Sequence, residues 1–99
     1  MDLTPQQLEQ VRDIFKQHMP TAKVYAFGSR VRLTAKAHSD LDLVIVEGSA
    51  IPLQRMQLLE EAFSESDLPF RVDVLDWHAI SPEFREQIAA RCERIWGGP

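Results

Sequence analysis

A short stretch near the middle of this 99-residue sequence carries the side chains with the clearest chemical potential. Gly28 and Ser29 are followed by ten residues and then by Asp40-Leu41-Asp42, which gives the pattern G-S-x10-D-x-D. Two residues separated by one position on a strand project from the same face of a sheet. The pattern therefore predicts a paired-carboxylate site close to a glycine-serine turn.

A third aspartate, Asp73, lies in a later run with strand character. If that strand runs parallel to the one carrying Asp40 and Asp42, its carboxylate stands next to theirs. Three adjacent carboxylates repel one another unless protons or a cation relieve the charge. An all-oxygen ligand set suits Mg²⁺, which often completes its coordination shell with substrate phosphates. The acids therefore predict a site for Mg²⁺ and a nucleotide, with two ions about 3.5 to 4 Å apart if the site is of the two-metal type.

The glycine-serine turn suits the phosphates of such a nucleotide. Gly28 has no Cβ to block a phosphate from the backbone, and Ser29 offers a hydroxyl and an amide at a possible helix N-terminus. Arg30 and Arg32 can neutralise phosphate charge through planar, bidentate contacts. The alternative interpretation is that the turn only ends a strand and that both arginines are solvated surface residues.

Other residues near the acids favour structural interpretations. Asp76 lies three residues after Asp73, on the opposite face of the strand, and is expected to cap the strand exit. His38 is interpreted as a loop histidine, because an oxygen-rich site disfavours imidazole. Cys92 is expected to be inert core on the last helix, and as the single cysteine it excludes an internal disulfide or a thiolate zinc site.

The elements that must position the acids follow from periodicity and capping signals. Thr4-Pro5-Gln6-Gln7 combines an N-cap, a proline at the first helical position and a capping box. We expect an α/β (α+β) fold in one domain over residues 1–99, with a small mixed sheet of about three strands flanked by helices and a parallel crossover between the last two strands. The expected elements are a helix after Thr4 that ends at Pro20, strands over 23–27, 40–46 and 71–75, a short helix within 29–37, a helix between 52 and 64, and a helix from 81 to about 95.

Composition excludes several classes of protein. The chain is 44% hydrophobic and 26% charged, which is typical of a folded globular domain. Its formal net charge of -4 argues against direct nucleic-acid binding, because that affinity depends on clusters of cations. The sequence has no long apolar span, and its acidic, polar N-terminus does not resemble a signal peptide, so we expect no membrane association and a cytoplasmic location.

Two segments, GSRVRLTAKAHSDLDLVIV and RVDVLDW, resemble the DNA-polymerase-β-type nucleotidyltransferase superfamily. The short chain resembles its minimal nucleotidyltransferase (MNT) branch, and the resemblance covers roughly residues 20 to 96. It implies that both acids of the D-x-D pair bind metal ions, that Asp73 is the third carboxylate, and that Gly28 and Ser29 hold the nucleotide phosphates. Asp73 would also help to activate the acceptor hydroxyl, as a metal ligand or a general base.

The resemblance also implies a reaction and a partner. The reaction is nucleotidyl transfer from a nucleoside triphosphate, with ATP as the donor by resemblance and pyrophosphate as the leaving group. MNT proteins of this size are similar to antitoxins that transfer AMP to a tyrosine of a HEPN-type RNase toxin. Two alternatives remain open: a non-catalytic module that neutralises the toxin by contact alone, and a transferase that acts on a small molecule such as an aminoglycoside.

Overall fold

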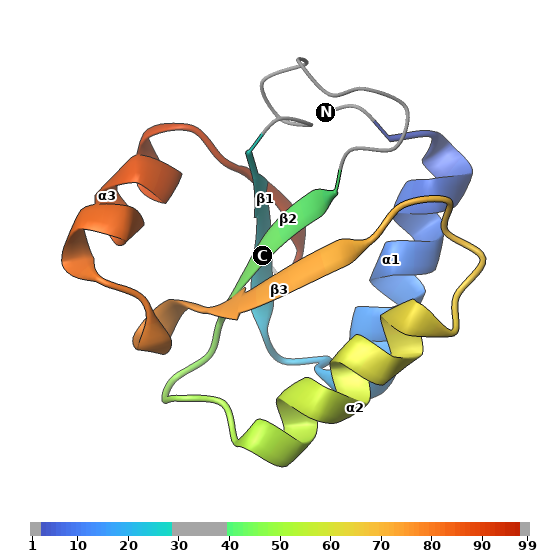
Figure 1. Ribbon diagram of the computed structural model, residues 1–99, viewed down its shortest axis with the longest axis horizontal. Coiled ribbons are helices and arrows are strands. Elements are labelled where there is room, and N and C mark those ends of the chain that lie inside the picture. Colours follow the sequence, from blue (N-terminus) through green and yellow to red (C-terminus); the bar gives the residue numbers. More distant parts are fainter. Residues whose placement is uncertain (1–2, 29–39, 98–99) are drawn as a thin grey trace.

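The predicted aspartates lie on or next to a four-stranded sheet whose two faces are covered by helices (Figure 1). The computed structural model describes residues 3–28 and 40–97. None of the helices in this part of the chain is long and apolar enough to cross a membrane. The elements are α1 (Pro5–His18), β1 (Lys23–Phe27), β2 (Leu41–Val46), α2 (Leu53–Ser64), β3 (Val72–Asp76), the short 3-10 helix η1 (Trp77–Ala79), α3 (Pro82–Ala90) and β4 (Glu93–Trp96).

The short helix expected within residues 29–37 falls outside the described residues. The same is true of four side chains singled out from the sequence: Ser29, Arg30, Arg32 and His38.

Helix α1 begins where its capping signals predicted. The backbone N–H of Gln7 donates to the Thr4 hydroxyl at 3.1 Å, and the Gln7 side chain accepts from the Thr4 N–H at 3.0 Å. Each bond satisfies a backbone donor that the first helical turn would otherwise leave free. The helix ends at His18, one residue before its C-cap Met19, because the following Pro20 cannot continue it. The predicted capping box is confirmed.

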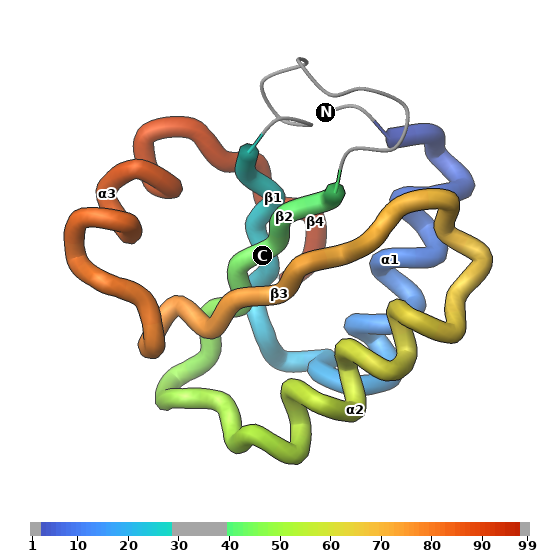
Figure 2. Tube along the Cα trace, in the orientation of Figure 1, coloured from blue at the N-terminus to red at the C-terminus, as the bar shows by residue number. Residues whose placement is uncertain are grey.

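The sheet is mixed, and its strand order is β3-β2-β1-β4 (Figure 2). β1 pairs antiparallel with both β2 and β4, whereas β2 and β3 run parallel. Parallel strands cannot be joined by a tight turn, and α2 provides the crossover between them. The predicted mixed sheet, its parallel crossover and its interior second strand are confirmed.

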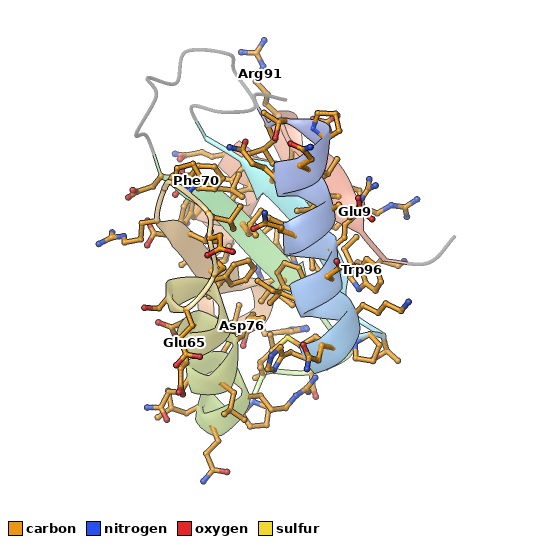
Figure 3. The ribbon with its side chains drawn as sticks, turned by 90° about the vertical axis from the view of Figure 1, so that its right-hand side faces the viewer. Glu9, Glu65, Phe70, Asp76, Arg91 and Trp96 are labelled. Carbon is orange, nitrogen blue, oxygen red and sulfur yellow. The ribbon has the colours of Figure 1, made fainter. Side chains whose placement is uncertain are left out.

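One face of β2 belongs to the hydrophobic core, and the other face carries the candidate site residue Asp42. Leu41, Leu43 and Ile45 are fully buried in the hydrophobic core beneath α1 and α2, the two helices nearest the viewer in Figure 3. The alternate residues face the other side of the sheet, where Val44 shares a hollow with Ile88 of α3. The alternation of a strand therefore places the Asp42 side chain on the α3 face.

The end of the chain differs from the sequence prediction. The last helix stops at Ala90, and residues 93–96 form a fourth strand instead of a continued helix. The apolar spacing of this region fitted a helix, but β4 covers the edge of β1, which would otherwise present unpaired backbone groups. Ile95 is 3% exposed, and its carbonyl accepts a 2.9 Å hydrogen bond from Arg12 Nε. Cys92 is half-buried and lies between α3 and β4, so its predicted place on the helix was wrong.

Candidate active site

The three predicted acids meet at one end of the parallel pair. Asp42 lies directly opposite Asp73 in the β2–β3 register, so their side chains project from the same face of the sheet. Asp40 precedes Asp42 by two positions, just before β2 begins. The structure therefore brings together, at the starts of β2 and β3, all three carboxylates that the sequence singled out.

Gly28 lies beside this group because β1 runs antiparallel to β2. Phe27, the last residue of β1, is paired with Asp42, and Gly28 follows it with a φ of 80°. A Cβ at Gly28 would overlap Oδ2 of Asp42 and lie 3.3 Å from its Cγ. Glycine is required here both by its left-handed backbone conformation and by the close approach of the carboxylate. The structure thus adds a second reason for the glycine that the sequence interpretation, based on phosphate access, did not contain.

A cation that the sequence analysis passed over stands among the acids. Nη2 of Arg71 lies 3.4 Å from Oδ2 of Asp40 and 3.3 Å from Oδ1 of Asp73. The carboxylates are about half-buried, at 42% and 40% side-chain exposure, while the arginine is 74% exposed. Its position two residues before Asp73, within the strand predicted over residues 71–75, was the signal that could have identified it, because such residues share a face.

On the face of the sheet that α3 covers, Asp42 lines a hollow of about 300 Å³. Phe27 and Phe84 line it and meet edge to face, with ring centroids 5.9 Å apart. Arg91, the C-cap residue of α3, lines the same hollow and is exposed, and its side chain projects outward in Figure 3. An aromatic wall with a cationic rim suits a nucleotide, whose base is flat and whose phosphates are anionic. Sequence analysis missed Arg91 because it expected the helix to continue through this position.

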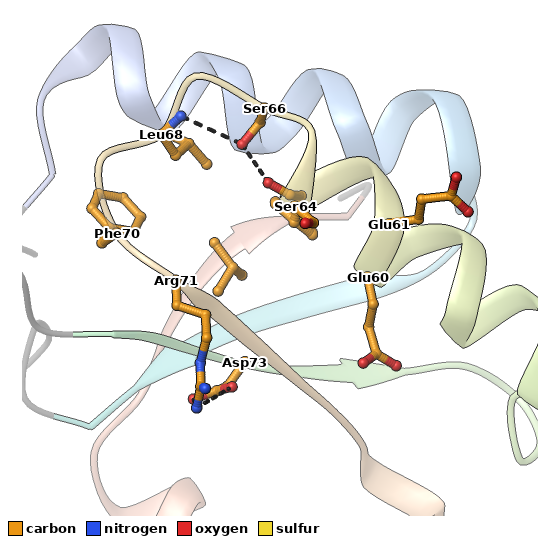
Figure 4. Close-up of a pocket in the computed structure, with 10 residues that line it drawn as sticks. Glu60, Glu61, Ser64, Ser66, Leu68, Phe70, Arg71 and Asp73 are labelled. Carbon is orange, nitrogen blue, oxygen red and sulfur yellow. Dashed lines mark hydrogen bonds and ion pairs between the residues drawn. The ribbon is translucent and has the colours of Figure 1, made fainter.

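A second hollow, of about 670 Å³, flanks the site between α2 and the edge strand β3 (Figure 4). Arg71 and Asp73 line it from the strand, and Glu60 and Glu61 line it from the helix. In Figure 4 the ion pair of Arg71 with Asp73 lies on the side of the sheet away from α1. The acidic group is thus open to solvent on two sides.

The donor set fits a hard divalent cation. Asp40, Asp42 and Asp73 offer only carboxylate oxygens, the ligands that Mg²⁺ prefers. Within residues 3–28 and 40–97, no three acidic, histidine or cysteine side chains are already arranged around a single ion. A positive group nevertheless bridges two of these acids, since one Arg71 nitrogen reaches both Asp40 and Asp73. Asp40 and Asp73 thus lie close enough to share one cation, and Asp42 is the neighbour of Asp73 in the sheet.

Asp76 does not belong to this group. It is 9% exposed, and its two oxygens accept hydrogen bonds from the backbone N–H groups of Ile51 at 2.9 Å and His78 at 3.0 Å. A buried carboxylate that satisfies two backbone donors serves the fold. The interpretation of Asp76 as a cap at the strand exit is confirmed.

Fold and site together define a nucleotidyltransferase: a mixed sheet with three aspartates at one end, beside a glycine in a left-handed turn. The chain belongs to the family described as "Polymerase beta, Nucleotidyltransferase", whose sequence profile matches residues 9–97. The resemblance drawn from the two sequence segments is thereby confirmed. A relative in Haemophilus influenzae, a probable protein adenylyltransferase MntA, is 48% identical over 88 residues, which span 89% of this chain and 77% of that protein.

Solved structures share the fold. One is a toxin-antitoxin complex with AMP-PNP, with a TM-score of 0.78 and 21% identity, covering 92% of this chain and 73% of that chain. Another is a tri-AMPylated HEPN toxin from Shewanella oneidensis in complex with an MNT antitoxin, with a TM-score of 0.69 and 18% identity, covering 92% of this chain and 70% of that chain. At these identities the likeness shows the architecture of the domain.

Proposed function

We propose that this protein is a Mg²⁺-dependent adenylyltransferase that transfers AMP from ATP to a tyrosine of a HEPN-type toxin and so acts as its antitoxin. Family membership sets the class of reaction, and the 48% identical relative is named as a probable protein adenylyltransferase. A structure of the same fold pairs an MNT antitoxin with an AMPylated HEPN toxin. The observation that carries the proposal is the register of Asp42 with Asp73 beside Gly28.

In this proposal Asp40, Asp42 and Asp73 would hold Mg²⁺, which would supply positive charge for the triphosphate and for the charge that develops on it. Gly28 and Ser29 bind the phosphates through the turn that follows β1. Arg30 contributes a further cation to the same phosphates.

The nucleoside is assigned to the hollow on the α3 side. Phe27 and Phe84 provide an aromatic wall there, and the hollow reaches Gly28 and Asp42 directly. A nucleotide seated in it would place its base against the aromatic side chains and its phosphates at the acidic end of the sheet. Arg91 at the rim is positioned to meet a phosphate or ribose oxygen.

The chemical step needs one base and one leaving group. Asp73 would activate the acceptor hydroxyl, either as the general base that takes up its proton or as a ligand of the metal. The hydroxyl oxygen then bonds to the α-phosphorus while the bond from that phosphorus to the bridging oxygen breaks, and pyrophosphate leaves with the electron pair. Because Asp73 lies on an edge strand and is 40% exposed, a side chain of a partner protein can reach it.

The test incubates the protein with its HEPN-type toxin, ATP and Mg²⁺ and weighs the toxin by mass spectrometry. We expect the toxin to gain AMP, and we expect Asp42→Asn to slow this gain at least about a hundredfold, the scale of losing one essential electrostatic contact. Asp13→Asn is the matched control, because Asp13 is an exposed aspartate on α1, across the sheet from the acids.

Three outcomes would contradict the proposal. Full activity of Asp42→Asn would show that the acidic group does not take part in the reaction. A toxin that is inhibited but unmodified would identify a non-catalytic binding module. Adenylylation of a small hydroxylated acceptor such as an aminoglycoside, without any partner protein, would identify a small-molecule transferase.

A further inference from the structure

One arginine neutralises part of the candidate metal site. Nη2 of Arg71 lies between Asp40 and Asp73, at 3.4 and 3.3 Å from their nearest carboxylate oxygens. A cation that bound these two acids would have to lie between them, which is where the guanidinium stands. The metal ion and the Arg71 guanidinium would therefore compete for the same two carboxylates.

The contacts of Arg71 are weak enough to be exchanged. Charge-assisted hydrogen bonds between nitrogen and carboxylate oxygen are usually about 2.7 to 2.9 Å long. Those of Arg71 are 3.3 to 3.4 Å, and its side chain is 74% exposed. Ion pairs in such solvent contribute little individually and are screened by salt.

The arginine can also move without disturbing the sheet. Its backbone is held in place, because the Arg71 carbonyl accepts a 2.9 Å hydrogen bond from the Leu41 N–H at the start of the parallel pair. Only the long side chain needs to rotate. The hollow of about 670 Å³ between α2 and the edge strand β3 borders Arg71, so open space is available to the displaced guanidinium at the edge of the sheet (Figure 4).

We propose that Arg71 is an internal counter-cation of the metal site. It holds Asp40 and Asp73 together while no metal is bound, and an arriving divalent cation displaces it. Arg71 therefore sets the concentration of metal at which the site fills, and it acts as a positioning residue through the acids. This inference rests on the proposed function, since it takes the three aspartates as metal ligands.

The test measures metal binding directly, without the reaction. Thermal unfolding is followed in EDTA and across a titration with Mg²⁺ for the wild type, Arg71→Ala and Arg71→Lys. We expect Arg71→Ala to unfold at a lower temperature in EDTA and to need roughly three- to tenfold less Mg²⁺ for half of its stabilisation, the range expected when two exposed ion pairs no longer compete. Arg71→Lys should fall between the two, because a lysine keeps the charge but has no planar fork.

Arg94→Ala is the matched control. It also removes one positive charge, from an exposed residue on β4, at the opposite edge of the sheet. Its Mg²⁺ titration should overlay that of the wild type. If Arg71→Ala and the wild type share the same Mg²⁺ midpoint, Arg71 does not compete and the inference is wrong. If the wild type shows no response to Mg²⁺ or Mn²⁺, the proposed metal-dependent function fails first.

Discussion

The two ends of the parallel β2–β3 pair neutralise their carboxylates in different ways. At the start of the pair, Asp73 faces the exposed side chain of Arg71 at 3.3 Å. At the other end, Asp76 is 9% exposed and accepts hydrogen bonds from two backbone N–H groups at 2.9 and 3.0 Å. These two aspartates are three residues apart on one strand. The two side chains have the same chemistry, so their different partners explain why Asp73 is proposed to bind a ligand while Asp76 holds the fold.

His78, which donates its backbone N–H to Asp76, is itself held by a neighbouring group of contacts centred on Glu47. Arg55 donates two hydrogen bonds to Glu47, at 2.9 and 3.1 Å, and this pairing raises the pKa of the Arg55 guanidinium above its ordinary value. Nε2 of His78 lies 2.6 Å from the Glu47 carbonyl oxygen. A buried carboxylate held by backbone donors, as Asp76 is, could reach a metal only by giving up contacts that hold the fold. Asp73 is instead paired with an exposed arginine at 3.3 Å, and a metal could replace that contact in the proposed function without breaking a backbone hydrogen bond.

The largest effect on stability is expected from Asp76→Asn. The amide nitrogen of asparagine cannot accept a hydrogen bond, so the N–H of either Ile51 or His78 would face another donor. Leaving a buried donor unsatisfied costs about 1 to 3 kcal/mol, which chemical denaturation would measure. The stabilisation by Mg²⁺ should stay the same as in the wild type. A changed Mg²⁺ midpoint with unchanged stability would erase the distinction between the two ends.

A somewhat smaller loss of stability is expected from Gly28→Ala, beside Asp42 in the candidate site. The left-handed backbone alone costs a residue with a side chain about 1 to 2 kcal/mol, and the new methyl group would also push Asp42 out of place. Thermal unfolding and Mg²⁺ titration should therefore both respond. Gly48→Ala is the control, because a Cβ at Gly48 meets nothing within 4 Å. If both variants behave alike, the Gly28 contact does not shape the site.

Much of the candidate site could be predicted from short sequence patterns and from general rules of strand pairing. The D-x-D spacing places two acids next to each other, and the parallel pairing of the two strands was expected from the helical crossover between them. Asp76 was separated from Asp73 by strand alternation alone. These predictions depended on short sequence separations and on rules of backbone geometry, which one sequence contains.

The parts that could not be predicted depend on contacts between distant segments. β4 forms a strand because the edge of β1 needs a partner, and its apolar spacing also fitted a continued helix. Arg71 acquires its role only when β2 brings Asp40 alongside β3. Arg91 joins the hollow of Asp42 because α3 packs over that face of the sheet. Tertiary packing determines each of these features.

The sharpest comparison between the two ends uses the same substitution at both. In EDTA, Asp73→Asn should change the free energy of unfolding by less than about 0.5 kcal/mol, because the loss of an exposed ion pair is offset by less repulsion among the acids. Paired thermal melts with and without Mg²⁺ should show that Asp73→Asn loses most of the stabilisation by Mg²⁺. Asp76→Asn should instead lose stability in EDTA and keep the stabilisation by Mg²⁺. A large loss of stability for Asp73→Asn in EDTA would mean that Asp73 also holds the fold. The exchangeable partner would then not explain why one carboxylate of β3 is available to a ligand and the other is not.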